Sequence, residues 1–483
     1  MFQKMLIGGK LVGKDEKGKR IKVINPATEK TYAHVPKGKV KHINKAVAAA
    51  KKAFPKWAAT SQAKRQEVVS KIADVISNNA EMLARIMVKE QGKPMPEALG
   101  EMAWTEGYLR HYATLSVEGR TIQDDETFKI EMRRVPLGVV AGICPWNFPV
   151  LVPFWKIGPA LIAGCPLIIK PSESTPLATL KVIGLLNEAG LPPGVLQCVT
   201  GYGPEVGEPL VTHPDVRRVA LTGSSQTGQR VMSLAAPTFK RVTLELGGSD
   251  PMIVCPDADI RKAISGAMIG RFWNAGQACL AVKRLYLFDE IYDEFVDGLV
   301  KKVAQYEVGD PTTRPDRPKV RMGPLHAQFQ LEEVEAQLQD AVSKGATVRV
   351  GGKRPADPAL TNGFYFEPAV VENVPHDSRL VTEEVFGPVL PVFRVSSLEE
   401  AIARANDTVY GLGSSIWTNN MAWANKAIRE INAGVTWVNQ IHYGYDELPF
   451  GGVKASGIGH EHGPEAVDYY LESKGAVFGG LDI

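Results

Sequence analysis

The stretch Val139-Val140-Ala141-Gly142-Ile143-Cys144-Pro145-Trp146-Asn147 joins a short apolar run directly to a polar turn. Four similar apolar runs follow before residue 250, at 167–169, 195–199, 219–221 and 242–246. Segments of helical length separate the runs. Strands that alternate with helices are typical of a parallel sheet with helices on both faces. The sequence therefore predicts an α/β fold, and the five runs form its first sheet.

Glycine or polar residues follow every one of these runs, and ligands of parallel sheets bind outside the carboxyl ends of the strands. The residues at these ends are Pro145-Trp146-Asn147, Lys170-Pro171-Ser172-Glu173, Gly201-Tyr202-Gly203, Thr222-Gly223-Ser224 and Glu245-Leu246-Gly247-Gly248. Lys170 and Glu173 suit ribose hydroxyls, and a helix capped by Ser224 or Ser225 suits a phosphate. Each feature alone is explained equally well by ordinary structure: a lysine at the sheet's rim, a carboxylate in a first helical turn, a capped helix.

Two further regions complete the predicted organisation. Apolar runs at 252–255, 284–288, 347–350, 389–395, 414–417 and 434–438, with helices at 326–344 and 398–405, predict a second α/β domain. Helical spacing, as in Val68, Ile72 and Ile76, predicts that the first hundred residues are helical. Residues 116–137 alternate in polarity, which predicts a β-ribbon whose exposed edges invite pairing with another chain.

Composition excludes several classes of protein. The 483 residues carry 56 Lys and Arg against 53 Asp and Glu, a net charge of +3 that supports neither a nucleic-acid nor a membrane partner. The N-terminus turns to Gly-Gly-Lys too early for a signal peptide, and the prolines in the uncharged stretch 135–155 argue against a membrane helix. Five cysteines without a C-x-x-C pair suit a reducing cytoplasm.

Two residues are candidates for chemistry. Cys279 follows Asn274-Ala275-Gly276-Gln277-Ala278, small and amide residues that leave room for a ligand beside a reactive thiol, whereas the other cysteines lie in apolar runs. Glu245 ends an apolar strand, where a carboxylate is either paired or has the raised pKa of a general base. His460-Glu461-His462 lacks a further ligand, so no metal site is predicted.

Seven blocks, taken together, resemble the NAD(P)-dependent aldehyde dehydrogenase superfamily in its hydrolytic, non-acylating form. They are Pro145-Trp146-Asn147-Phe148-Pro149, Lys170-Pro171-Ser172-Glu173, Thr222-Gly223-Ser224, Leu244-Glu245-Leu246-Gly247-Gly248, Phe272 to Cys279, Glu383-Glu384-Val385-Phe386-Gly387-Pro388 and Pro449-Phe450-Gly451-Gly452. They stand in the family's order and span nearly the whole chain. The resemblance implies a Rossmann-like dinucleotide domain (1–118 and 138–248), a catalytic α/β domain (249–455) and an oligomerisation element (119–137 and 456–483).

The resemblance also implies a role for each matching residue. Cys279 would add to the aldehyde to give a thiohemiacetal and then a thioester, Asn147 would hold the oxyanion, and Glu245 would activate the hydrolytic water. NAD(P)+ would be held by a set of residues along the cleft: Trp146, Lys170, Ser172, Glu173, Gly223, Ser224, Glu384 and Phe386. Glu245 favours hydrolysis over transfer to coenzyme A. The choice between NAD and NADP stays open.

The substrate pocket is expected to be apolar, from residues placed by the resemblance: Trp104, Phe148, Val152, Trp155, Ala278, Leu280 and Tyr443. None of these is an arginine that would bind a terminal carboxylate, so we expect neutral aliphatic or aromatic aldehydes. We expect a homodimer or homotetramer built through the ribbon. Two alternatives are a structural protein that reuses the fold and a cofactor-independent thiol esterase. Retention of Cys279, Glu245, Asn147, Lys170 and Gly223 argues against the first, and the nucleotide residues argue against the second.

Overall fold

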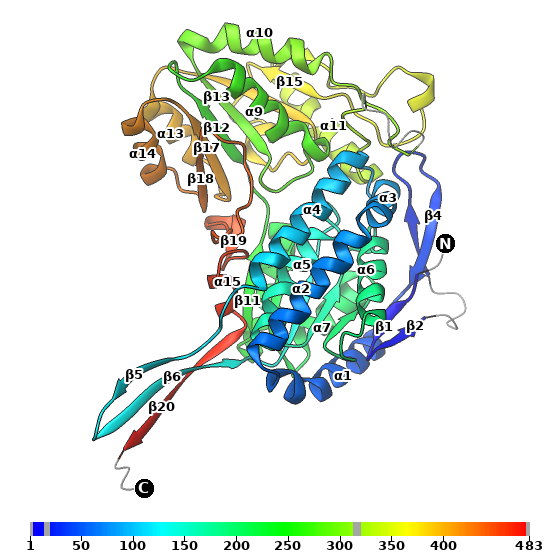
Figure 1. The fold of residues 1–483 in the computed structure, drawn as a ribbon. Coiled ribbons are helices and arrows are strands. Elements are labelled where there is room, and N and C mark those ends of the chain that lie inside the picture. Colours follow the sequence, from blue (N-terminus) through cyan, green and yellow to red (C-terminus); the bar gives the residue numbers. More distant parts are fainter. Residues whose placement is uncertain (1–2, 14–19, 313–319, 480–483) are drawn as a thin grey trace.

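The computed structural model describes residues 3–13, 20–312 and 320–479. Two α/β units lie one above the other, and a narrow ribbon projects from the lower unit (Figure 1). The predicted α/β class is confirmed by two mainly parallel sheets, one of eight and one of seven strands.

The first sheet has a parallel centre and antiparallel edges. Its strands run in the order β19-β11-β10-β7-β8-β9-β1-β2, and the pairs from β11 to β9 are parallel. The bounds are β1 (Met5–Ile7), β2 (Lys10–Val12), β7 (Val139–Ile143), β8 (Leu167–Lys170), β9 (Leu196–Cys198), β10 (Val216–Thr222), β11 (Arg241–Glu245) and β19 (Gly457–Ile458). The five predicted strands are present, with ends displaced by up to a few residues.

Helices cover both faces of this sheet. Along β7, Val140 faces one core and Val139, Ala141 and Ile143 face the other, as a strand buried on both sides requires. One face is covered by α2 (Gln62–Asn78), α3 (Ala80–Glu90), α4 (Met95–Tyr112), α5 (Leu151–Ala163) and α6 (Leu177–Glu188). The other carries α1 (Val40–Ala58), α7 (Glu208–Thr212) and α8 (Ser225–Ala235).

The prediction that the first hundred residues are helical is wrong at their beginning. Residues 5–36 contain β1, β2, β3 (Arg20–Ile24) and β4 (Thr31–Pro36), and helices begin only at α1. β1 extends the first sheet through Leu6, whose partner is Cys198 in β9. β1 also pairs with β2 across the Gly8-Gly9 turn, but strands of three residues are too short to show a clear periodicity.

The second sheet runs β14-β15-β16-β13-β12-β17-β18 and is parallel except for β14 and β15. Its strands are β12 (Asp250–Val254), β13 (Val282–Phe288), β14 (Thr347–Val350), β15 (Ala369–Glu372), β16 (Val389–Val395), β17 (Gly413–Trp417) and β18 (Val435–Val438). The helices are α9 (Ile260–Phe272), α10 (Tyr292–Val303), α11 (Gln328–Ser343), α12 (Arg379–Thr382), α13 (Leu398–Asn406) and α14 (Met421–Glu430). All six predicted strands are present.

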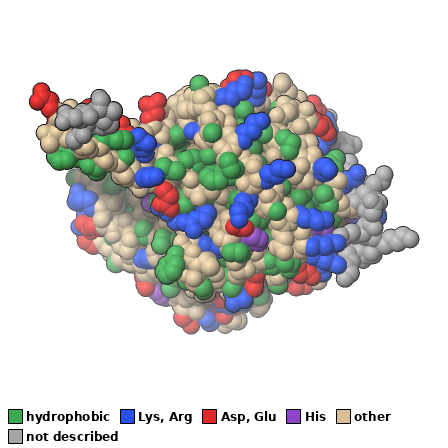
Figure 2. All heavy atoms as spheres, turned by 90° about the horizontal axis from the view of Figure 1, so that it is seen from below, with side chains coloured by type: hydrophobic (Ala, Val, Ile, Leu, Met, Phe, Trp, Pro, Cys, Tyr) green, Lys and Arg blue, Asp and Glu red, His purple; other side chains and the backbone are tan. Residues whose placement is uncertain are grey.

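The ribbon is a three-stranded sheet that brings distant segments together. β6 (Phe128–Pro136) lies between β5 (Arg120–Asp124) and β20 (Leu471–Gly479), and both pairings are antiparallel. A short helix, α15 (Glu465–Asp468), precedes β20. Ile122 and Val477 expose more than half of their side chains, and hydrophobic groups gather along this arm in the view from below (Figure 2). The predicted ribbon is therefore present, with its third strand supplied by the same chain.

Residues 135–155 form the end of β6, all of β7 and the beginning of α5, as their prolines predict. In the part of the chain that the structure describes, no helix is long and apolar enough to cross a membrane.

Candidate active site

A cavity of about 1130 Å³ lies where the carboxyl ends of the first sheet face the second α/β unit. Its walls include the predicted catalytic residues Cys279, Glu245 and Asn147, which come from three separate segments of the chain. The predicted cofactor and substrate residues also line it, namely Trp146, Lys170, Glu173, Gly223, Ser224, Glu384 and Phe386, with Trp104, Phe148, Val152, Trp155, Ala278, Leu280 and Tyr443. Ser172 is not in the lining, and its hydroxyl lies 3.0 Å from Ser174 Oγ within the turn.

Cys279 follows a tightly wound loop after α9. Asn274 and Ala275 both have left-handed backbone angles, with φ of 51° and 55°, and Gly276 has φ of 72°. A Cβ on Gly276 would lie 2.4 Å from the Gly387 carbonyl oxygen, so only glycine fits there. The other four cysteines are buried, whereas Cys279 is partly exposed. Such strained backbone persists only where its surroundings hold it.

The Cys279 thiol is protonated in its resting environment. Desolvation raises its pKa to about 12, and the neighbouring charge of Lys283 acts in the opposite direction. Lys283 donates a hydrogen bond to the Ala278 carbonyl at 3.0 Å and lies 3.3 Å from Glu384. A base must therefore take the proton before the sulfur can attack an electrophile.

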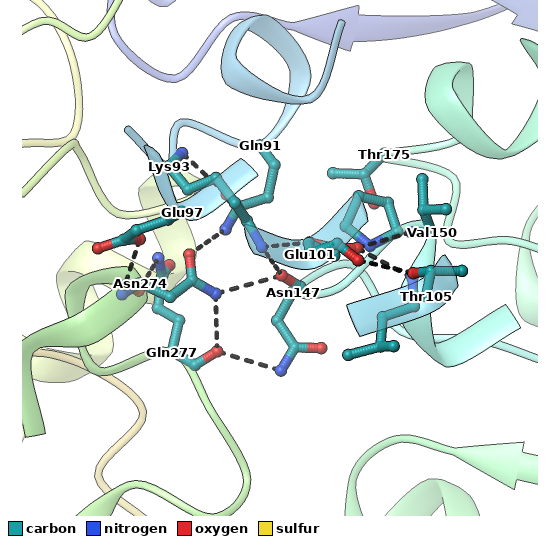
Figure 3. Close-up of polar contacts among 12 residues, drawn as sticks. Gln91, Lys93, Glu97, Glu101, Thr105, Asn147, Val150, Thr175, Asn274 and Gln277 are labelled. Atoms are coloured by element: carbon teal, nitrogen blue, oxygen red, sulfur yellow. Dashed lines mark hydrogen bonds and ion pairs between the residues drawn. The ribbon is translucent and has the colours of Figure 1, made fainter. Parts of the chain in front are cut away.

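Asn147 lies in the loop between β7 and α5, and its side-chain amide is fixed. Asn147 Nδ2 donates to the Gln277 carbonyl at 3.1 Å, and Figure 3 shows the two residues facing each other. An amide nitrogen carries two hydrogens, so one remains for a ligand in the cavity. Gln277 also anchors the loop on its far side, because His326 N donates to Gln277 Oε1 at 2.8 Å.

Glu245 is a buried carboxyl whose desolvation is not offset by any hydrogen bond within the described residues. It is 2% exposed, and neither of its oxygens has a hydrogen-bond partner among the described residues. Desolvation raises its pKa well above the usual range, and Glu461 raises it further, whereas Lys156 lowers it. A carboxyl in this state is suited to accept a proton near neutral pH.

Lys156 and Glu461 lie near Glu245, and neither was predicted as a site residue. Lys156 Nζ donates to Thr222 Oγ1 at 2.8 Å and lies 3.1 Å from Glu461 Oε1, with both side chains fully buried. The available signal was a single lysine in an otherwise apolar buried helix. Within the described residues, no group of three His, Cys, Asp or Glu could hold a metal.

Other parts of the cavity wall carry charged and polar groups. Lys170 Nζ lies 3.3 Å from Glu173 Oε2, and Glu384 Oε1 accepts a hydrogen bond from Gly248 N at 3.0 Å. Ser224 is the N-cap of α8 and accepts from Thr227 N at 3.2 Å, which confirms one of the two predicted caps. Trp146 stacks on His326, with ring centroids 4.4 Å apart.

Aromatic rings line the part of the cavity beside Cys279. Trp104 packs against Trp273 and Tyr443, with centroids 5.1 and 5.5 Å apart. Sequence reasoning missed two polar groups here: Asp446, and His462, which lies 3.5 Å from it. Asp446 belongs to a loop without regular structure, which carries no periodic signal in the sequence.

Comparison with known proteins matches the Aldehyde dehydrogenase family over residues 13–476. The chain belongs to the aldehyde dehydrogenase family. It is 41% identical over 467 residues to the peroxisomal aminoaldehyde dehydrogenase 2 of Pisum sativum, covering 94% of this chain and 92% of that protein. It is 38% identical to the betaine aldehyde dehydrogenase of Bacillus subtilis, covering 98% and 97%.

Solved structures agree with this assignment. A putative aldehyde dehydrogenase from Burkholderia cenocepacia has a TM-score of 0.95 at 38% identity, covering 99% of this chain and 97% of that one. A 3,6-anhydro-L-galactose dehydrogenase in complex with NAP has a TM-score of 0.94 at 38% identity, covering 99% and 100%. The resemblance found in the sequence, the fold class and the assignment as an aldehyde dehydrogenase are confirmed.

Proposed function

We propose that this aldehyde dehydrogenase oxidises neutral aldehydes to carboxylic acids with NAD(P)+, through a thioester on Cys279 that water hydrolyses. The observation that carries the proposal is that a partly exposed thiol, a fixed amide and a carboxyl without hydrogen bonds line one cavity. These groups match a nucleophile, an oxyanion donor and a general base.

The first step is addition of Cys279 to the aldehyde. The thiol gives up its proton, directly or through water, to Glu245, whose raised pKa suits it to receive one. The sulfur forms a bond to the carbonyl carbon, and the electron pair of the C=O bond moves to oxygen. Asn147 Nδ2 and the Cys279 backbone N–H donate hydrogen bonds to this oxyanion, which lowers the barrier.

The second half of the reaction releases the acid. When bound, NAD(P)+ would supply the acceptor for the hydride of the thiohemiacetal, and a thioester on Cys279 would result. Glu245 releases to solvent the proton that it took from the thiol, and it then removes a proton from water as the water attacks the thioester carbonyl. The same two donors stabilise the second oxyanion. As this oxyanion re-forms the C=O bond, the C–S bond breaks, the sulfur takes the proton from Glu245, and the carboxylic acid leaves a regenerated thiol.

The residues at the far end of the cavity fit a dinucleotide. The N-terminus of α8 opens into the cavity behind Gly223 and Ser224, where backbone N–H groups suit a pyrophosphate. We expect Lys170 and Glu173 to bind one ribose, and Glu384, with Phe386, to bind the second, since all four line the cavity. Because Glu173 is 39% exposed and turned toward Lys170, both a 2′-hydroxyl and a 2′-phosphate are compatible with this wall.

The preference for neutral substrates rests on the pocket around Trp104. Its wall is aromatic, and the Asp446 carboxylate would repel an anionic tail. The arginine in the cavity lining, Arg230, pairs with Glu208 beside α8 and so serves the cofactor end. Relatives are named for aminoaldehyde, betaine aldehyde and succinate semialdehyde, so the family alone does not choose the substrate.

The proposed domains are 1–118 with 138–248 for the dinucleotide, 249–455 for catalysis and 119–137 with 456–483 for assembly. The two sheets support this division, although β19, from the assembly segment, joins the first sheet beside β11. The outer edges of β5 and β20 support a homodimer or homotetramer formed through the ribbon. The boundaries at residues 1 and 483 lie outside the described residues. We place the enzyme in the cytoplasm.

The test is reduced nicotinamide formation, followed by absorbance, with a neutral aldehyde and NAD+ or NADP+. We expect turnover with the wild type and none with Cys279→Ser. Succinic semialdehyde should give a lower kcat/KM than a neutral aldehyde of similar length. Turnover that survives in the variant would contradict the proposed nucleophile, and a preference for the semialdehyde would contradict the proposed substrate class.

A further inference from the structure

The end of α3, the turn after it and the first two turns of α4 bury four ionisable side chains, Glu90, Lys93, Glu97 and Glu101, which we call the charged corner. All four are at most 9% exposed. Each of its three carboxylates accepts hydrogen bonds from the backbone of a different segment. Ionisable side chains are buried in this number only where partners stabilise them, and burial still raises the pKa of Glu90 and Glu97 to about 8. The partners indicate what the corner holds in place.

Glu101 and Lys93 hold the segment that carries Asn147. Glu101 Oε1 accepts from Val150 N at 2.8 Å and Leu151 N at 3.0 Å, at the beginning of α5, where Val150 offers no cap of its own. Lys93 Nζ donates to Glu101 Oε2 at 2.6 Å and to the Asn147 carbonyl at 2.9 Å. Figure 3 shows the Asn147 amide pointing away from this pair, so its main chain is held from behind.

Glu97 holds the segment that carries Cys279. Glu97 Oε2 accepts from Asn274 N at 3.0 Å, in the loop with left-handed backbone angles. Asn274 Nδ2 in turn donates to the Asn147 carbonyl at 3.2 Å, and Gln91 Nε2, beside the corner, donates to Asn274 Oδ1 at 3.0 Å. Figure 3 shows these contacts as one continuous network.

The two proposed oxyanion donors therefore share one support. Asn147 follows a strand of the first sheet and Cys279 precedes a strand of the second, so neither sheet alone sets the distance between them. The corner contacts both segments and belongs to the helical layer beside the first sheet. Donors of an oxyanion hole act only when they are held close to their final geometry.

We propose that Lys93, Glu97 and Glu101 are positioning residues that set the spacing of the oxyanion hole, with Lys93 acting through the main chain of Asn147. This inference rests on the proposed function of Asn147 and Cys279. It adds residues that touch neither substrate nor cofactor, in a segment outside the blocks that carry the family resemblance.

The test is Lys93→Met, which removes both hydrogen bonds but keeps the length of the side chain. We expect the rate of the first turnover, and the hydrolysis of p-nitrophenyl acetate, to fall about 10- to 100-fold, the size of a small misplacement. Alkylation of Cys279 by iodoacetamide forms no oxyanion and should be unchanged. The affinity for NAD+, measured by fluorescence titration, should also be unchanged.

Arg65→Met is the matched control. Arg65 is a buried charged residue of α2 that contacts the C-terminal end of α5, whereas the charged corner contacts the beginning of α5. Its Nε donates to the Ile162 carbonyl at 2.9 Å. This variant should lose stability without loss of the first-turnover rate. If it loses that rate as Lys93→Met does, or if Lys93→Met slows alkylation equally, the corner only supports the fold and the inference is overturned.

A double-mutant cycle tests the route through Asn147. Adding Lys93→Met to Asn147→Ala should slow ester hydrolysis no further, since the group that Lys93 positions is already absent. If the two substitutions slow ester hydrolysis independently of each other, the inference is overturned. If Lys93→Met fails to fold, Lys93→Met with Glu101→Gln removes both members of the ion pair and replaces the single variant in every measurement, with the same outcomes.

Failure of the inference is distinguishable from failure of the proposed function. A wild type that turns over, with Asn147→Ala impaired and Lys93→Met fully active, contradicts the inference alone. An Asn147→Ala variant as active as the wild type contradicts the oxyanion role itself, and with it the inference.

Discussion

Glu101 and Glu245 are two carboxyls of equal burial that the chain treats in opposite ways. Glu101 is 0% exposed and accepts hydrogen bonds from Lys93 and from two backbone N–H groups. Glu245 is 2% exposed and, within the described residues, accepts none. Burial is the same, so the supply of donors decides whether a carboxyl stabilises the structure or remains available to take a proton.

Glu90 extends this comparison. It accepts from Leu177 N at 2.7 Å and Ala178 N at 2.8 Å, at the beginning of α6, where Pro176 offers no cap. Glu101 serves α5 in the same way. Buried helix N-termini need acceptors because their first N–H groups have no partner within the helix. Carboxylates of the charged corner supply them from another element.

The largest expected effect is the loss of activity when Glu245, the carboxyl without hydrogen-bond donors, is substituted. Glu245→Gln should lower steady-state turnover by at least about 100-fold, because a general base contributes that much or more. The first turnover should still form reduced nicotinamide, more slowly than in the wild type because the thiol proton passes to water instead of to Glu245, and the acyl group should remain on Cys279. Stopped-flow absorbance and intact mass measure both. Full steady-state turnover in this variant would contradict the proposed role of Glu245 as general base.

The second expected effect is a difference in stability between variants of Glu101 and variants of Glu245. Glu101→Leu should lower the free energy of unfolding by about 3 to 5 kcal/mol, since it leaves Lys93 buried without its counter-charge. Glu245→Gln removes a desolvated carboxyl and should unfold at the same or a higher urea concentration than the wild type. Urea unfolding followed by tryptophan fluorescence compares the variants. Equal stability of Glu101→Leu and wild type would contradict the role of pairing.

The third effect is a dependence on pH. The raised pKa of Glu245 means that the folded state holds a proton that the unfolded state loses near pH 4.5. The wild type therefore loses stability as the pH rises from there toward the raised pKa, and the stability difference in favour of Glu245→Gln should grow over that window. Unfolding at several values between pH 5 and 9 measures the trend. A difference that does not change with pH would contradict the raised pKa.

The smallest effect concerns an ordinary cap far from the cavity. Ser397 caps α13 through Oγ, which accepts from Glu400 N at 3.2 Å. Ser397→Ala should cost about 1 kcal/mol of unfolding free energy and leave kcat/KM unchanged. Thermal unfolding and a standard assay check both. A loss of activity here would show that stability and catalysis are less separable than the two carboxyls suggest.

Local patterns predicted most of this molecule. The strands at 347–350 and 389–395 were predicted with the bounds that the structure gives. The second is a nearly continuous apolar run and is buried, whereas the first alternates between exposed and partly buried residues. Glu245 was singled out by the same logic, as a carboxylate at the end of an apolar run. What alternates or repeats within a few residues is visible in a sequence.

Partners that are distant in the chain were not predicted. β1 pairs with β9 and β19 pairs with β11, and these partners lie far away in the chain, so the pairings have no local signature, although β1 also forms a hairpin with β2. Lys93 looks like a solvent-exposed lysine beside a glycine and a proline, and only the fold shows its contact with Asn147. Lys156 and Glu461 are 305 positions apart, and their pairing follows from the fold and not from spacing.

The pairing of β20 with β6 and of β19 with β11 has a consequence for synthesis. A chain that emerges from the ribosome N-terminus first exposes β6 and β11 long before β20 and β19 exist, and Glu461 lies 305 positions after Lys156. The nascent chain can therefore form the part of the cofactor wall around Lys170 and Ser224 early, but the surroundings of Glu245 only near the end of translation. An unfinished polypeptide would contain Cys279, Glu245 and Asn147 but would not be active. Ribosomes stalled before β19 should carry an inactive intermediate in which the edge strand β11 is unpaired on its outer side.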